Sequence, residues 1–222
     1  MKTIKPTQTP TYKTPLTAWV MALSLALTAC GGGGSSTPAP TPAPAATPTP
    51  TATPAAAPTP APLVCAPLGA SDGVPADQTC GLGGFQSELL ASINNARSTG
   101  LNCGGAVMPP VCPVRWDGQL QNAATAHSTD MATNNFFDHL SPTNGTRIGA
   151  RASAAGYNYR TVGENIAAGY TNVNDVMAGW IASPSHCANM MTPAFVDLAV
   201  SCKINPSSTY QYYWTMVLGK RQ

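Results

Sequence analysis

Residues 31–63 consist almost entirely of Gly, Ser, Thr, Pro and Ala, so any hydrophobic core has to be built without them. Their first large apolar side chain is Leu63. Such a composition cannot offset the entropy lost on ordering. Its Thr-Pro and Ala-Pro repeats favour polyproline II, and at ~3.1 Å per residue we expect a tether reaching on the order of 100 Å. About 140–155 residues remain, which is enough for one domain.

The N-terminal segment has the features of an export signal. Three lysines precede an apolar run, residues 16–29. The 14 residues of this run fall short of the ~20 that a membrane-spanning helix needs. We therefore interpret residues 1–29 as a signal peptide.

The end of this signal, Leu27-Thr28-Ala29-Cys30, resembles a bacterial lipobox. The resemblance implies cleavage before Cys30 and lipid attachment there, which would anchor the exported protein to a bacterial membrane. The alternative is ordinary cleavage near Ala29 with Cys30 free. Gly31 is not an inner-membrane retention aspartate, so we expect delivery to the outer membrane if the cell is Gram-negative, or otherwise to the cell surface.

The net charge of +2 is set by the N-terminus. Without its three lysines the chain carries 8 Lys and Arg against 9 Asp and Glu. A near-neutral domain with no basic run gives no electrostatic reason to bind nucleic acid. We expect no nucleic-acid partner and a monomeric protein.

The cysteine count fits export. If lipid takes Cys30, six cysteines remain and three disulfides become possible, with fifteen connectivities. The six are Cys65, Cys80, Cys103, Cys112, Cys187 and Cys202. We expect Cys65–Cys80 as a local pair that ties a lead-in, residues 65–84, to the domain. The other four allow either 103–112 with 187–202, or 103–187 with 112–202. The expected order is therefore a signal at 1–29, a lipidated linker at 30–64, this lead-in, and one domain at 85–222.

Hydrophobic periodicity places helices before strands in that domain. Expected helices cover residues 85–98, 119–134, 147–155 and 173–182, the last ended by Pro184. Residues 102–113 are expected to form a loop. Expected strands cover 197–204 and 210–218, joined by a hairpin turn at 206–208. This order predicts an α+β domain.

Several polar and aromatic residues are expected to be structural. His127 lies on the apolar stripe of the 119–134 helix, which is typical of a satisfied core histidine. Arg97 is expected to form a salt bridge or to bind main-chain carbonyls. Trp116, Trp180 and Trp214 are core candidates.

Three other residues carry the chemistry. His139 in FFDHL, Glu164 in GENIA and His186 in SPSHCANMM lie 25 and 22 residues apart. Two imidazoles and a carboxylate are the ingredients of a divalent-metal or an acid–base site. Only tertiary structure can bring them together at this spacing.

Residues 89–219 resemble the bacterial branch of the CAP superfamily, also called the SCP domain, which includes cysteine-rich secretory, antigen 5 and pathogenesis-related proteins. The matching elements are, in order, Asn94-x-x-Arg97, AHSTDMA, FFDH, Arg147 to Gly156, GENIA, Trp180 with SPSHCANMM, DLAVSC and YYWTMVLG. The resemblance implies a three-layer α–β–α sandwich. It also implies a cleft in which several members bind a divalent cation.

The resemblance places His139, Glu164 and His186 at the positions of the family's cleft residues. The family's second cleft glutamate corresponds to Ser183, so one negative charge is missing here. His139 and His186 are the implied ligands for Zn²⁺ or another divalent cation. Glu164 is a candidate general base or a structural acceptor, and Asn165 is expected to complete a turn beside it in the cleft.

The leading functional expectation is an envelope-tethered lipoprotein whose cleft binds a glycan, a lipid or a peptide. The first alternative is a hydrolase of cell-wall peptide or glycan, with Glu164, His139 and His186 as catalytic residues. The second is a non-catalytic structural or adhesive module.

Overall fold

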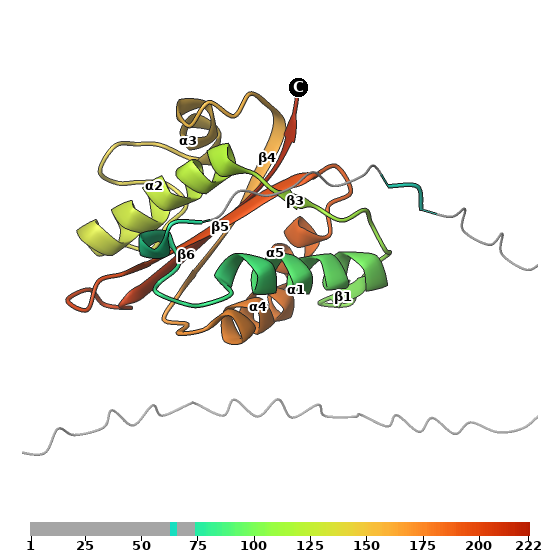
Figure 1. The fold of residues 1–222 in the computed structure, drawn as a ribbon, viewed down its shortest axis with the longest axis horizontal. Coiled ribbons are helices and arrows are strands. Elements are labelled where there is room, and N and C mark those ends of the chain that lie inside the picture. The colour runs from blue at the N-terminus through green and yellow to red at the C-terminus, as the bar shows by residue number, and fades with distance from the viewer. Residues whose placement is uncertain (1–62, 66–73) are drawn as a thin grey trace, which may run out of the picture. The chain divides into compact units, whose positions relative to one another are not determined.

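The computed structural model describes residues 63–65 and 74–222, which form an α–β–α sandwich (Figure 1). The expected signal peptide, Cys30 and the linker up to residue 62 lie outside the described residues. So do residues 66–73 of the lead-in. No helix in the described ranges is long and apolar enough to cross a membrane.

A four-stranded sheet forms the middle layer, in the order β3-β5-β6-β4. The strands β5 (Asp197–Ile204) and β6 (Tyr212–Arg221) form an antiparallel hairpin. On the other side of β6, β4 (Tyr159–Ala168) also runs antiparallel to it. The short strand β3 (Arg115–Trp116) pairs with β5 in parallel. The sheet therefore has β4 at one edge.

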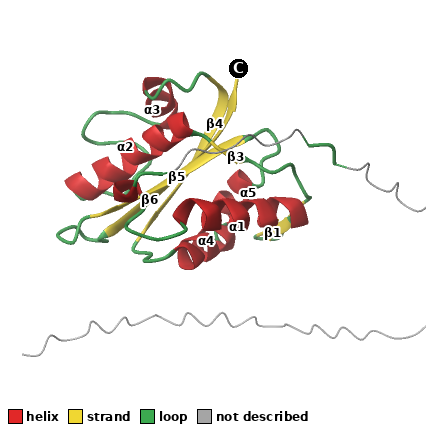
Figure 2. Ribbon diagram, in the orientation of Figure 1, coloured by secondary structure: helices red, strands yellow, loops and turns green. Residues whose placement is uncertain are grey.

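Helices cover both faces of this sheet, as Figures 1 and 2 show. One face carries α2 (Gly118–Asn134) and α3 (Ile148–Ala154). The opposite face carries α1 (Phe85–Thr99), α4 (Val173–Ala182) and α5 (Pro184–Met190). A 3-10 turn, η1 (Ala76–Gln78), and a small hairpin of β1 (Leu101–Cys103) and β2 (Ala106–Met108) complete the described elements. The α+β fold and its three layers are confirmed.

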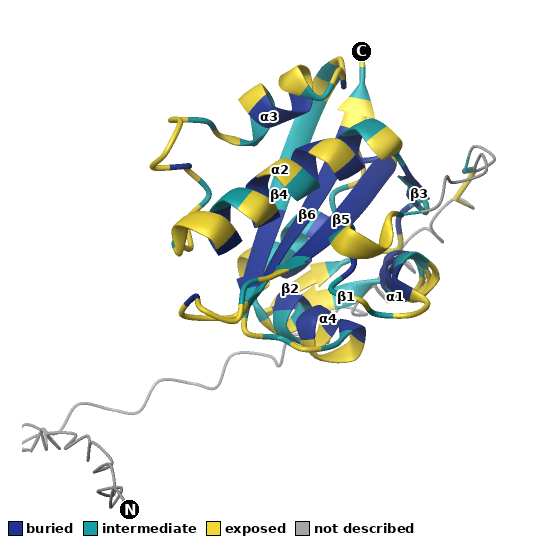
Figure 3. Cartoon of the chain, turned by 60° about the vertical axis from the view of Figure 1, so that its left-hand side comes forward, coloured by how far each residue is buried: buried dark blue, intermediate teal, exposed yellow. Residues whose placement is uncertain are grey.

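The central strands are buried on both faces, whereas the outer sides of the helices are exposed (Figure 3). Strand residues alternate between the faces because the side-chain period of a strand is two. Ser201 of β5 bonds to Ser128 of α2, which assigns its side of the sheet to α2. On the opposite side, Phe85 of α1 stacks on Trp214 of β6 at 5.7 Å between ring centroids. The expected tryptophans Trp116, Trp180 and Trp214 are all buried in this core.

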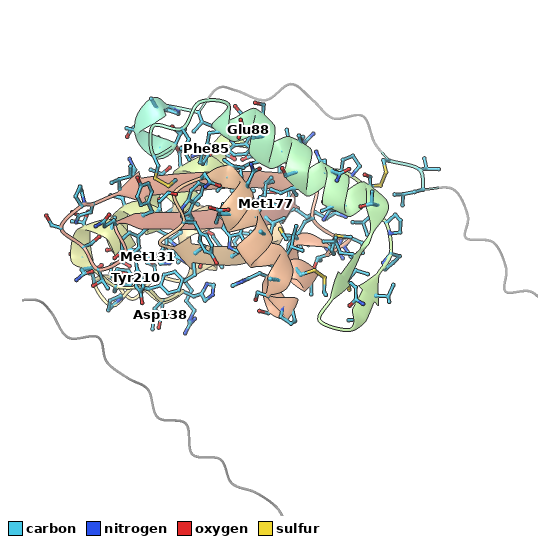
Figure 4. All side chains as sticks on the ribbon, turned by 90° about the horizontal axis from the view of Figure 1, so that it is seen from below. Phe85, Glu88, Met131, Asp138, Met177 and Tyr210 are labelled. Atoms are coloured by element: carbon cyan, nitrogen blue, oxygen red, sulfur yellow. A yellow bond between two sulfur atoms is a disulfide. The ribbon has the colours of Figure 1, made fainter. Side chains whose placement is uncertain are left out.

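The end of α2 is joined to the β5–β6 hairpin. Asn135 adopts a left-handed conformation at φ 53° as the C-cap of α2. Its side-chain oxygen accepts a hydrogen bond from the Thr209 main-chain N–H at 2.8 Å. Figure 4 shows Met131, Asp138 and Tyr210 gathered at this end of the domain. The loop that carries His139 therefore starts from a fixed point.

Arg97 of α1 is fully buried and binds main-chain carbonyls, one of its two expected roles. Its guanidinium donates to the carbonyl oxygens of Cys112, Met190, Thr192 and Phe195. Burial lowers the pKa of Arg97 to about 10, which leaves it charged at neutral pH. One side chain thus joins α1 to the segments before β3 and before β5.

The disulfides pair across the fold, so the expected local pair Cys65–Cys80 is wrong. The three bonds are Cys65–Cys112, Cys80–Cys202 and Cys103–Cys187. The pairs 103–112, 187–202 and 112–202 are also wrong, and 103–187 is the one expected pair that forms. Cys80 pairs with Cys202 because the neighbouring Thr79 forms a parallel β-bridge with Cys202, on the edge of β5 that faces away from β6. Sequence proximity is a weak guide once a chain segment joins a sheet.

Two elements at the site differ from the expectations. Pro184 ends α4 as expected, but it also occupies the first turn of α5, where its missing N–H costs nothing. Residues 159–168 carry no clear strand pattern, yet they form β4. Within the expected loop at 102–113, β1 and β2 pair as a small hairpin. The hairpin β5–β6 and the helices α1 to α4 lie where the periodicity predicts, with ends displaced by up to three residues.

Candidate functional site

The candidate site is built around the middle of β4. Glu164 points to the face covered by α2 and α3, and its neighbour Asn165 points to the face covered by α5, since strand side chains alternate. His139 follows α2 in a loop. His186 lies on α5. The fold therefore brings all four residues to one edge of the sheet.

Glu164 is held on both carboxylate oxygens. His139 Nδ1 lies 2.8 Å from Oε1, and Arg151 Nη2 of α3 donates to Oε2 at 2.7 Å. Its side chain is 2% exposed. Burial alone would raise the pKa of Glu164, but the hydrogen bond from His139 and the positive charge of Arg151, joined by that of His127 once it is protonated, hold it below its usual value. Glu164 is therefore an ionised anchor for its neighbours.

The hydrogen bond to Glu164 also fixes the orientation of the His139 imidazole and which of its nitrogens donates. A carboxylate only accepts hydrogen bonds, so His139 Nδ1 carries the proton. In the neutral tautomer Nε2 is then the nitrogen with the lone pair, and 45% of the side chain is exposed. This is the arrangement by which a carboxylate orients a histidine for binding or catalysis.

His127 supports the same loop from inside the core, as expected of a core histidine. Its Nε2 donates to the Asp138 carbonyl oxygen at 2.9 Å, directly before His139. Its Nδ1 is buried and has no hydrogen-bond partner in the described structure. Burial, the largest effect, lowers the pKa of His127, although Glu164 opposes the shift. His127 is thus a neutral residue that positions the main chain of the His139 loop.

These shifts predict a domain that loses stability in acid. A folded-state pKa below the unfolded value means that the unfolded chain binds more protons as the pH falls. His127 and His186 should cost stability below about pH 6.5, and Glu164 below about pH 4.5, their ordinary values. We expect the free energy of unfolding, measured with denaturant from pH 8 to pH 4, to fall first below about pH 6.5 and again below about pH 4.5.

The matched variant is His127→Gln, which keeps an N–H donor near the Asp138 carbonyl and cannot titrate. It should show a smaller decline between pH 7 and pH 5 than the parent protein. Parallel declines in the two proteins would contradict the role given to His127.

On the α5 face, Asn165 and Asn189 close the site. Asn165 Nδ2 donates to the His186 carbonyl oxygen at 3.1 Å, and Asn189 Nδ2 donates to Asn165 Oδ1 at 2.8 Å. Asn165 is buried within β4, so the expectation that it completes a turn is wrong. Gly163 leaves room for this pair, because a Cβ at this position would lie 2.5 Å from Asn189 Oδ1 and displace its side chain.

A cavity of about 480 Å³ lies where these residues meet. Its lining residues are His139, Glu164, Asn165, Ser185, His186, Ala188, Asn189 and Thr192. Ser183, the expected cleft hydroxyl, lies at the junction of α4 and α5, and Ser185 lines the cavity instead. Burial and then repulsion from His139 lower the pKa of His186, and both imidazoles line this cavity. A larger cavity of about 710 Å³ lies along α1 and includes none of these residues.

The donor set fits a tightly bound metal ion poorly. Zinc sites in proteins use three or four protein ligands. Within residues 63–65 and 74–222, no group of three His, Cys, Asp or Glu side chains is arranged to hold a metal ion. Both oxygens of Glu164 are already engaged. His139 and His186 would supply two nitrogens, and we assign no chemical step to a cation.

Residues 90–218 match the cysteine-rich secretory protein family, CAP, and the chain belongs to this family. An extracellular protein of Bacillus anthracis that contains an SCP domain has a similar fold, with a TM-score of 0.53 and 26% identity over 69% of this chain and 45% of that one. An outer surface protein of Borrelia burgdorferi shares the fold, with a TM-score of 0.51 at 19% identity over 61% of this chain and 92% of that one.

Two curated proteins of Bacillus subtilis are also similar. The uncharacterized protein YkwD is 39% identical over 88 residues, which are 40% of this chain and 34% of that protein. The uncharacterized membrane protein YlbC is 30% identical over 87 residues, which are 39% of this chain and 25% of that protein. The matched region thus spans about a third of the length of one relative and a quarter of the other.

Sequence reasoning missed two residues of the site. Arg151 lies in the expected 147–155 helix, but nothing in its spacing indicates a partner 13 residues away. Asn189 lies within the SPSHCANMM string, and its role depends on α5, which was not expected. The signal that could have found Asn189 is Pro184, because proline is common in the first turn of a helix.

Proposed function

We propose that this protein is an exported binding protein of the bacterial envelope, whose cavity at β4 binds a ligand through His139 and His186. The observation that carries this proposal is the state of Glu164. Its carboxylate is 2% exposed and bonded to His139 and Arg151. A general base has to reach the proton that it abstracts, and a carboxylate this buried and already paired with Arg151 is poorly placed to do so, which favours binding over hydrolysis.

The proposed location follows from covalent features. Three disulfides are typical of proteins in oxidising compartments. We propose that lipid on Cys30 anchors the chain and that residues 31–63 hold the domain away from the membrane. Membrane fractionation of a Cys30→Ala variant tests the anchor: the variant should move to the soluble fraction, and continued membrane association would refute lipidation.

Binding is tested with purified bacterial peptidoglycan, phosphatidylethanolamine–phosphatidylglycerol vesicles and a phage-displayed heptapeptide library. For the probe that binds, His139→Ala and His186→Ala should each weaken the affinity about tenfold, the effect of losing one hydrogen bond. The control is Thr99→Ala at the exposed end of α1, which should bind as the parent does. Unchanged binding in both histidine variants would contradict the proposal.

The same proteins separate binding from the alternatives. Product release from peptidoglycan that disappears in Glu164→Gln would favour a hydrolase. Titration with Zn²⁺ alone should show binding that is weak and lost in either histidine variant, because His139 and His186 are the two imidazoles among the described residues that line the cavity.

A further inference from the structure

We propose that the ligand is an extended peptide segment that pairs as an added strand with the free edge of β4. This inference rests on the proposed binding function and names the ligand class. The sheet ends at β4, which has no second strand partner among the described residues. An edge strand presents unpaired main-chain N–H and C=O groups and can accept another chain.

The register shows which main-chain groups of β4 face outward. Gly169 N–H donates to the Tyr212 carbonyl oxygen at 2.9 Å, which defines one hydrogen-bonded pair of the β4–β6 ladder. Such pairs recur at every second residue, so Gly163 and Asn165 also face β6. Val162 and Glu164 therefore direct their N–H and C=O groups away from the sheet.

These outward groups are accessible and unused. Glu164 as a residue is partly exposed although its side chain is 2% exposed, so its accessible surface belongs to the main chain. No described residue donates to or accepts from the main chain of Val162 or Glu164 on this side. One step further, Trp180 Nε1 donates to the Ile166 carbonyl oxygen at 3.3 Å. The open part of the edge is therefore Val162 to Glu164, beside the cavity.

The cavity lies on both sides of this edge. His139 borders it on the α2 face of the sheet, and Ser185, His186 and Asn189 border it on the α5 face. Successive side chains of an added strand would point alternately to these two walls. Both walls are polar, which fits a peptide with hydroxyl, amide or carboxylate side chains. A peptide backbone supplies a donor and an acceptor at every second residue, about 7 Å apart, as the two outward residues require.

The test uses heptapeptides selected by phage display on the purified full-length protein. Synthetic copies of a selected peptide are N-methylated at one position at a time. Methylation at alternate residues should weaken binding at least tenfold, because it removes the N–H groups that face β4, and methylation at the residues between them should have little effect.

A pair of protein variants tests the same hydrogen bonds on the protein, at the main-chain N–H of Val162. Val162→Pro removes an outward N–H that β6 does not use, and proline is tolerated on edge strands. Val162→Ala removes apolar side-chain surface while keeping the N–H. We expect Val162→Pro to bind the peptide at least tenfold more weakly than Val162→Ala.

Two outcomes would overturn the strand-addition proposal. One is equal sensitivity to N-methylation at all positions together with equal binding by the two Val162 variants. The other is His186-dependent binding of an N-acetylglucosamine oligosaccharide without any peptide binding, which would leave the proposed binding function intact. If no probe depends on His139 or His186, the proposed function fails as well.

Discussion

Replacing Arg97 by methionine is expected to lower the free energy of unfolding by about 3–5 kcal/mol. Methionine fills much of the same space, but it leaves the carbonyl oxygens of Cys112, Met190, Thr192 and Phe195 without their donor. A buried acceptor that loses its partner retains the full cost of desolvation. Thermal unfolding followed by circular dichroism should show a midpoint lower by roughly 10 °C.

Arg97→Lys is the matched variant for this prediction. It keeps the positive charge, but an ammonium group cannot reproduce the fork of a guanidinium over separate carbonyls. Its midpoint should lie between those of the parent and Arg97→Met. If Arg97→Met unfolds within about 2 °C of the parent, the structural role of this residue is refuted.

Removing the Cys80–Cys202 disulfide with a double serine variant is expected to cost about 2–5 kcal/mol. This bond closes a separation of 122 residues and joins the segment after η1 to the central strand β5. The native structure holds both ends without it, since Cys80 N–H donates to the Cys202 carbonyl oxygen at 3.2 Å. Removing the disulfide therefore mainly increases the entropy of the unfolded state, and the resulting loss of stability is measured by denaturant unfolding.

The Cys65–Cys112 disulfide provides the control. Its separation is 47 residues, but the two described residues before Cys65 are exposed, with Val64 90% accessible. Removing this bond releases the folded and the unfolded chain alike, so we expect a smaller loss of stability. Equal losses for the two double variants would contradict this explanation, and mass spectrometry of peptides from the parent checks the pairing itself.

Much of the fold could be predicted from the sequence because its main elements carry their own patterns. The helices around Leu89 and Leu120 show apolar residues at helical spacing, and the β5 strand alternates. β4 lacked such a signal, since Gly163, Glu164 and Asn165 at its centre have low strand propensity. These residues occupy a strand because tertiary contacts with both helical layers fix them there.

The candidate site was predicted less completely than the fold. The strings containing His139, Glu164 and His186 could be identified as the chemical residues, and the fold brings them to one cavity. Their roles depend on neighbours that spacing does not reveal. Arg151 occupies one oxygen of Glu164, and Asn189 holds Asn165. Contacts between different elements decide that Glu164 is an anchor.

The most direct test of a binding cavity at β4 is to map amide chemical shifts of the isotopically labelled protein while a bacterial envelope digest is added. We expect the largest changes at Glu164, Asn165, His186 and Asn189, with no change in the digest components over time. Changes confined to other parts of the domain, or cleavage products that vanish in Glu164→Gln, would contradict a non-hydrolytic binding cavity at this edge.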